Sequence, residues 1–292
     1  GGTGGLGSGL PGAHLFGSGQ LGSVGDIPRL ANTAILDAVQ ALSPVSAITV
    51  AGGFSNAHFF DPKDVLINSD QVTVEGGYTH LVSRHDQIGA VYAFQLFQFP
   101  QATGGEFYNH ILNLRFKYYL SGRMSLTAGA GPEYTILEEG GYENRWSLSA
   151  RVLLDYKFAH SSMAATYEKF TSAGSGFFAG ANTQAARLLY TRPFARTWEL
   201  YGDLAYSHNT KLQNIPGDLG AAGASSYDEG SAGAILRKHL GRAYDFFLAY
   251  RFSELSFNVP VCLNGVSGCG QVAQRNVGTI GIEWHPTPSR IE

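Results

Sequence analysis

Residues 144–158 read NRWSLSARVLLDYKF, and this stretch decides the fold class. Its even positions, from Trp146 through Leu148 and Val152 to Phe158, are apolar or small. Its odd positions carry the polar and charged side chains, including Arg151 and Asp155. Successive side chains of a strand point to opposite faces, so this alternation predicts a long β-strand with one apolar and one polar face.

The same alternation recurs along most of the chain and predicts about twelve strands. These strands are longer than the five or six residues that are usual in soluble sandwiches. Their connections alternate between tight turns, such as 121–122, and longer segments rich in Gly, Pro, Asp or Glu, such as 258–270. The expected strands are 47–60, 69–82, 86–99, 106–120, 123–137, 143–158, 161–171, 178–193, 196–209, 229–240, 242–257 and 271–285.

The faces opposite the apolar ones carry charges of both signs. An apolar face toward lipid and a polar face toward a lumen is the pattern of transmembrane barrels, in which short turns also lie at one rim and longer loops at the other. We expect the mixed charges to form either a charged constriction or an ion-pair network that satisfies buried charges, and favour the network. The lumen candidates are Arg115, Lys117, Glu133, Arg151, Asp155, Glu168, Arg187, Glu199, Asp203, Arg237, Asp245 and Arg251.

Residues 47–285 resemble the bacterial outer-membrane β-barrel proteins, loosely the porin-like group, by this periodicity and loop alternation rather than by a specific motif. The resemblance implies a single antiparallel up-and-down barrel over 46–285 with outer-membrane lipid as a partner. Such barrels commonly end on an aromatic residue, whereas here Trp284 is followed by a tail, 286–292. Aromatic residues suited to the two membrane interfaces stand near strand ends: Phe59, Phe60, Tyr118, Tyr119, Phe158, Trp198, Tyr244 and Trp284.

The segment before the barrel has two parts. Asp26 is a suitable N-cap, Pro28 suits a first turn, and Ala31, Ile35, Ala38, Val39 and Leu42 share a helical face, which predicts a short helix within 26–45. Such a helix would be about 25 Å long and is a candidate lumen plug. Residues 1–25 are a Gly-rich arm that reaches up to about 80 Å when extended. Its apolar anchors are Leu10, Leu15, Phe16 and Leu21.

The function classes follow from these parts. We expect a structural scaffold whose lumen holds the arm and helix of its own chain or of a neighbour, which would give a homo-oligomer or head-to-tail filament. The alternative is a passive diffusion porin. Ser207 and His208 are adjacent and point to opposite faces of a strand, and neither G-x-S-x-G nor H-E-x-x-H occurs, so no catalytic site is predicted.

Composition bounds the remaining partners and the compartment. The net charge of −3 offers no basic surplus for nucleic acid, and no cofactor or metal motif is recognised. The chain begins Gly1-Gly2, so we expect that a signal peptide has been cleaved on export to the outer membrane or cell surface. Cys262 and Cys269 flank a Gly-containing loop, and a disulfide between them would stabilise the fold by roughly 2–3 kcal/mol.

Overall fold

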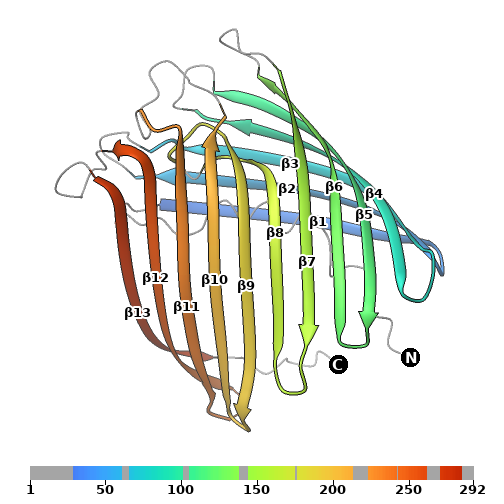
Figure 1. The fold of residues 1–292 in the computed structure, drawn as a ribbon, viewed down its shortest axis with the longest axis vertical. Coiled ribbons are helices and arrows are strands. Elements are labelled where there is room, and N and C mark those ends of the chain that lie inside the picture. The colour runs from blue at the N-terminus through green and yellow to red at the C-terminus, as the bar shows by residue number, and fades with distance from the viewer. Residues whose placement is uncertain are drawn as a thin grey trace, which may run out of the picture.

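The fold is one strongly curved antiparallel sheet, seen in a computed structural model (Figure 1). The structure describes residues 29–60, 66–100, 105–137, 144–174, 176–212, 223–241, 243–261 and 270–284. These contain thirteen strands that follow one another in space in the order β1 to β13. Each strand therefore pairs only with its neighbours in the sequence, which is the up-and-down topology that the alternating pattern predicted.

The strands are long enough to cross a membrane at a tilt. The shortest, β8, has 11 residues, and the longest, β12, has 18. Their bounds are β1 Arg29–Ser43, β2 Ser46–Phe59, β3 Ser69–Leu81, β4 Asp86–Gln98, β5 Glu106–Ser121, β6 Met124–Leu137, β7 Arg145–Lys157, β8 Ser162–Ser172, β9 Ala181–Ala195, β10 Trp198–Lys211, β11 Ser226–His239, β12 Tyr244–Val261 and β13 Gly270–Trp284. Each of the twelve predicted strands overlaps one of β2 to β13.

The connections divide the sheet into a turn end and a loop end. Tight connections join β1 to β2 through Pro44 and Val45, and β5 to β6 through Gly122 and Arg123. Longer segments join β2 to β3, β4 to β5, and every later even-numbered strand to the next. The predicted alternation of short and long connections is confirmed, and it places all the longer connections at one rim.

The predicted helix within 26–45 is wrong. Residues 29–43 form β1, which pairs antiparallel with β2 in the register Thr33↔Ser55 and Asp37↔Ala51. The segment is rich in Ala and Leu, so its apolar residues satisfy a helical spacing and a strand spacing equally well. The hydrogen-bond ladder with β2 outweighs the local helix propensity, which is a weak preference. The extra strand changes the expected twelve to thirteen and removes the candidate helical plug.

Closure of the sheet into a barrel stays a prediction. Among the described residues, β1 pairs with β2 alone and β13 pairs with β12 alone. The described part of the chain also holds no helix long and apolar enough to cross a membrane.

Candidate functional site

The two faces of the sheet have opposite chemistry. Outward-facing apolar side chains are strongly exposed, with Leu36 at 80% and Leu114 at 68%. The concave inner face instead buries polar groups, among them Asn109 and Glu133, which have no exposed surface. A protein folded in water would invert this distribution, whereas lipid outside and a polar lumen inside require it.

A buried carboxylate, Glu133 on β6, organises the inner wall toward the loop end. Asn109 on β5 donates from Nδ2 to its Oε1 at 3.1 Å. Ser147 on β7 donates from Oγ to its Oε2 at 3.0 Å, and the backbone amide of Thr171 on β8 donates to Oε1 at 3.3 Å. Four consecutive strands thus share one carboxyl group, whose burial is compensated by these donors.

Replacing Glu133 with Ala is expected to destabilise the folded state by about 1–3 kcal/mol for each buried donor left without an acceptor. The Glu133→Gln variant is the matched control, since it keeps one oxygen acceptor at nearly the same volume. The measurement is urea-induced unfolding in lipid bilayers. Equal destabilisation by the two variants would contradict a role based on hydrogen bonding.

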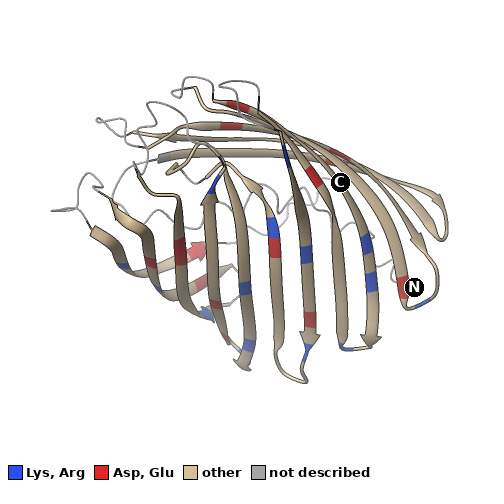
Figure 2. Cartoon of the chain, turned by 45° about the horizontal axis from the view of Figure 1, so that its top comes forward, with Lys and Arg blue, Asp and Glu red and all other residues tan. Residues whose placement is uncertain are grey.

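Seven of the twelve charges that the sequence predicts for the lumen form ion pairs between strands. Positions of both signs are spread over the strands of the sheet (Figure 2). Arg151 on β7 contacts Glu168 on β8 at 3.0 Å. Asp203 on β10 contacts Arg187 on β9 at 2.6 Å and Arg251 on β12 at 3.5 Å. These pairs form between strands because the register places an acid and a base on the same face, as in Arg151↔Glu168.

A second charge network lies near the turn end, on the last three strands. Arg237 on β11 contacts Asp245 on β12 at 3.9 Å and Glu283 on β13 at 3.3 Å. His239 contacts the same Asp245 at 2.8 Å. The shared partners connect β11, β12 and β13 on the concave side of the sheet.

The remaining predicted charges also lie on the inner face but in other contacts. Lys117 Nζ lies 5.1 Å from the centroid of the Tyr119 ring, and Tyr201 donates a hydrogen bond to Glu199. Arg115 and Asp155 occupy inward positions of β5 and β7. Ser207 is buried on the inner face, whereas His208 points outward and contacts Asp228.

The connection between β8 and β9 crosses the concave face at the loop end, a path that the sequence did not predict. We call it the crossing loop; it joins β8 to β9 and is described at residues 173–174 and 176–180. Phe178 and Ala179 have no exposed surface, which is unusual for a connection between strands. The available signal was the apolar pair Phe177-Phe178 among the glycines of this segment.

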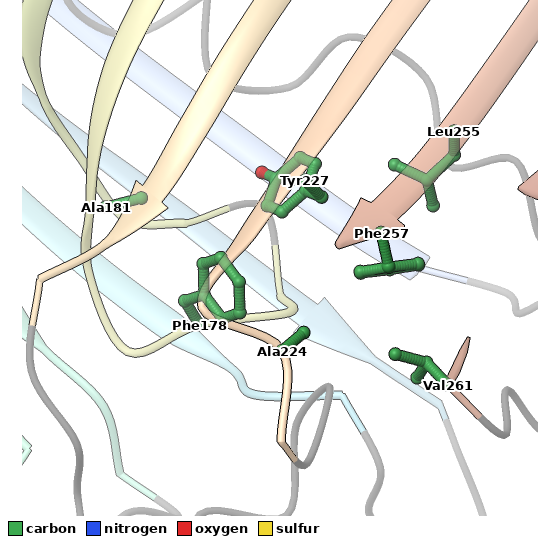
Figure 3. Packing of buried hydrophobic residues seen from close by; sticks show 7 residues of the cluster. All are labelled: Phe178, Ala181, Ala224, Tyr227, Leu255, Phe257 and Val261. Carbon is green, nitrogen blue, oxygen red and sulfur yellow. The ribbon is translucent and has the colours of Figure 1, made fainter. Parts of the chain in front are cut away.

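The crossing loop contacts both halves of the sheet. Phe178 packs in an aromatic cluster with Tyr227 of β11 and Phe257 of β12 (Figure 3). Phe177 lies 5.3 Å from Phe257, centroid to centroid, and packs against the cluster containing Phe59 of β2. One side chain therefore reaches between the second and the twelfth strand, and apolar groups cover part of the concave face at this end.

Backbone contacts fix the path of the crossing loop. The amide of Ile67 donates to the carbonyl of Gly176 at 2.8 Å, and that of Leu212 donates to the carbonyl of Gly180 at 3.1 Å. Gly180 has φ +89°, and a Cβ there would lie 2.6 Å from Cε1 of Phe107. Glycine is required at this position both for the backbone conformation and for the space.

The Gly180→Ala variant is expected to lower the melting temperature more than Gly223→Ala. Gly223 has φ +87° but nothing within 4 Å of an added Cβ, so it isolates the backbone cost of about 1–2 kcal/mol. An alanine at position 180 has the same backbone cost and must also displace the Phe107 ring. Thermal unfolding followed by circular dichroism measures the melting temperature of both variants. Equal decreases in melting temperature would mean that Phe107 moves aside at no cost in free energy.

Several predicted residues lie outside the described part of the chain. They are the disulfide candidates Cys262 and Cys269 and the arm anchors Leu10, Leu15, Phe16 and Leu21. Their roles stay predictions. Among the described residues, no group of three or more His, Cys, Asp or Glu side chains is placed to hold a metal ion.

The comparisons with known proteins concern the fold. No protein-family model matches the chain, and no curated protein matches it. Among solved structures, the FrpB iron transporter from Neisseria meningitidis, F5-1 variant, is similar with a TM-score of 0.52 at 9% identity over 78% of this chain. The F3-3 variant gives 0.51 at 9% identity, also over 78%.

The chain spans less than half the length of these structures, covering 45% of the F5-1 variant and 44% of the F3-3 variant. The ferric yersiniabactin uptake receptor FyuA from Yersinia pestis has a TM-score of 0.48 at 11% identity, with 80% of this chain and 44% of that chain covered. The two FrpB structures, with TM-scores above 0.5, show that the antiparallel up-and-down sheet of this chain is similar to part of a bacterial outer-membrane β-barrel.

Proposed function

We propose that the protein is an outer-membrane pore through which small hydrophilic solutes diffuse. The observation that carries this proposal is the pairing of an apolar, exposed outer face with an inner face of ion pairs and buried polar groups. Such a wall solvates polar solutes and excludes lipid tails. The similarity to outer-membrane barrels supports the location.

The distribution of charge suggests weak discrimination between anions and cations. Arg151 is opposed by Glu168, and Asp203 is shared by Arg187 and Arg251, so acids and bases alternate along the wall. Electrostatic selection needs a ring of one sign. Size is the stronger filter, because the crossing loop introduces aromatic side chains at the loop end.

The test is reconstitution of the full chain into planar bilayers, with salt-gradient measurements to compare the permeability of small anions and cations. We expect discrete, ohmic conductance steps with little preference for either sign. Absence of conductance in correctly folded protein would contradict the pore.

The competing hypothesis is a scaffold whose lumen is occupied by the N-terminal segment of its own or a neighbouring chain. The helical plug that this hypothesis included does not form, because residues 29–43 are strand β1. Its arm, 1–25, lies outside the described residues. Negative-stain electron microscopy separates the two hypotheses. Chains of barrels that disappear on deletion of residues 1–25 would favour the scaffold.

A further inference from the structure

The two edges of the sheet carry unpaired backbone. β1 hydrogen-bonds to β2 alone and β13 to β12 alone, so each leaves a row of N–H and C=O groups without a partner strand in the described structure. In hydrocarbon each such group costs several kcal/mol, and open sheet edges do not occur there. A sheet that crosses a membrane must therefore have its edges covered.

The exposure of β1 also indicates a missing neighbour. The inward-facing residues of β2, such as Ala51 and Ser55, are 4% and 5% exposed. The inward-facing Ile35 and Val39 of β1 are 42% and 40% exposed. Both strands contribute to the same concave face, so the difference arises because β1 has a neighbour on one side only.

Strand direction decides what covers the edges. Every neighbouring pair is antiparallel, so β1 and β13, both odd-numbered, run the same way, from the loop end to the turn end. Direct pairing of the two edges would be parallel. A second copy in the same membrane orientation would also present parallel edges. One strand running from the turn end to the loop end pairs antiparallel with both.

Two segments of this chain are joined in sequence to the edge strands. Residues 285–292 follow β13 in sequence and contain Pro286 and Pro288, neither of which can donate a hydrogen bond to a neighbouring strand. Residues 1–28 lead into β1 at the loop end, which gives them the direction required. Between Pro11 and Pro28 this segment has no proline, so its backbone can donate along a full strand.

The sequence of residues 12–24 suits this position. It is as long as β3, which has 13 residues, and it contains no Asp, Glu, Lys or Arg that would have to enter lipid. With 25–28 as the connection, Gln20 stands opposite the inward-facing Thr33. His14, Phe16, Ser18, Gln20 and Val24 would then share the lumen face, and Leu15, Leu21 and Ser23 would share the lipid face.

We propose that residues 12–24 form a strand that pairs with both β1 and β13 and closes the barrel. One strand added to the thirteen strands of the described residues gives an even number, which is the rule for single-chain bacterial barrels. This assignment goes beyond the pore function and places the arm in the wall rather than inside a lumen.

Cysteine cross-linking tests the proposal in the full-length chain. The background carries Cys262→Ser and Cys269→Ser. Gln20→Cys combined with Thr33→Cys probes the seam with β1. For the seam with β13, His14→Cys, Ser18→Cys or Gln20→Cys is combined in turn with the inward-facing Val277→Cys. Folded protein in bilayers is oxidised and analysed by non-reducing electrophoresis.

We expect an intramolecular cross-link, visible as a shift in mobility, for Gln20–Thr33 and for at least one of the three Val277 combinations. The matched control Leu21→Cys with Thr33→Cys should lose the shift, because its cysteines face opposite sides of the wall. A cross-link between Ile35→Cys and Val277→Cys would demonstrate direct parallel closure and overturn the proposal.

Other outcomes also overturn it. Covalent dimers would identify a second copy as the occupant of the edges. Absence of cross-links at both seams in correctly folded protein would exclude the segment from the wall. A chain that forms both seams but conducts nothing would contradict the pore and leave the closing strand standing.

Discussion

Leu188→Arg is expected to lower the free energy of unfolding in lipid bilayers by about 2–4 kcal/mol, the cost of a guanidinium at the mid-plane of the bilayer. Leu188 lies at the centre of β9 and faces outward, paired with Ala165 and with Leu204, which is 54% exposed. The measurement is urea unfolding of reconstituted protein followed by tryptophan fluorescence.

Leu189→Arg is the matched control for this substitution. Leu189 is the next residue of the same strand, faces the concave side, and is paired in register with Asp203. A guanidinium there enters a polar wall beside Asp203, which already contacts Arg187 and Arg251, and its cost should stay near the small values of exposed charges, about 1 kcal/mol or less. Equal costs for the two variants, or a larger cost at Leu189, would contradict the assignment of the outer face to lipid.

Replacement of residues 173–180 by Asn-Gly should raise the single-channel conductance several-fold. Ser172 and Ala181 are already cross-strand partners, so a two-residue turn can connect β8 to β9. The replacement removes Phe177 and Phe178 from the concave side, where they bridge β2 and β12. Planar-bilayer recording with uncharged polymers of graded size measures the change in the opening.

Two point variants test whether the change in conductance comes from the loop itself rather than from a general loss of stability. Phe178→Ala should raise conductance less than removal of the loop, since a cavity replaces one ring. Phe194→Ala should leave it unchanged, because Phe194 is 53% exposed and faces outward near the turn end. Unchanged conductance after removal of the loop would place the permeation path elsewhere.

Much of the wall could be predicted from sequence, because lipid imposes a strict alternation. A stretch such as 144–158 has a single arrangement that hides its charges from hydrocarbon, and β7 adopts it. The twelve charges named from the sequence share one face of the sheet in the registers of neighbouring strands, and their role as lumen residues stays a prediction. The pairing of individual acidic and basic side chains depends on the register between strands. The pattern of residues within one strand does not specify that register.

The errors have local causes. Residues 29–43 carry small and apolar side chains on both faces, so a helix and a strand fit them equally, and only the partner strand decides. The crossing loop was read as an ordinary connection because its path depends on contacts distant in sequence, such as Ile67 with Gly176. The glycines of this segment indicate an unusual backbone conformation, but they do not indicate which strands the loop contacts.

The connectivity has a consequence for the order of assembly. Because each strand pairs with its neighbours in sequence, the described sheet can grow hairpin by hairpin without waiting for distant segments. The crossing loop cannot, since its partners range from Phe59 to Phe257 and must all be in place first. During folding, residues 173–180 should therefore become resistant to protease only after β-structure has appeared. Their protection would mark the last stage of folding rather than the first.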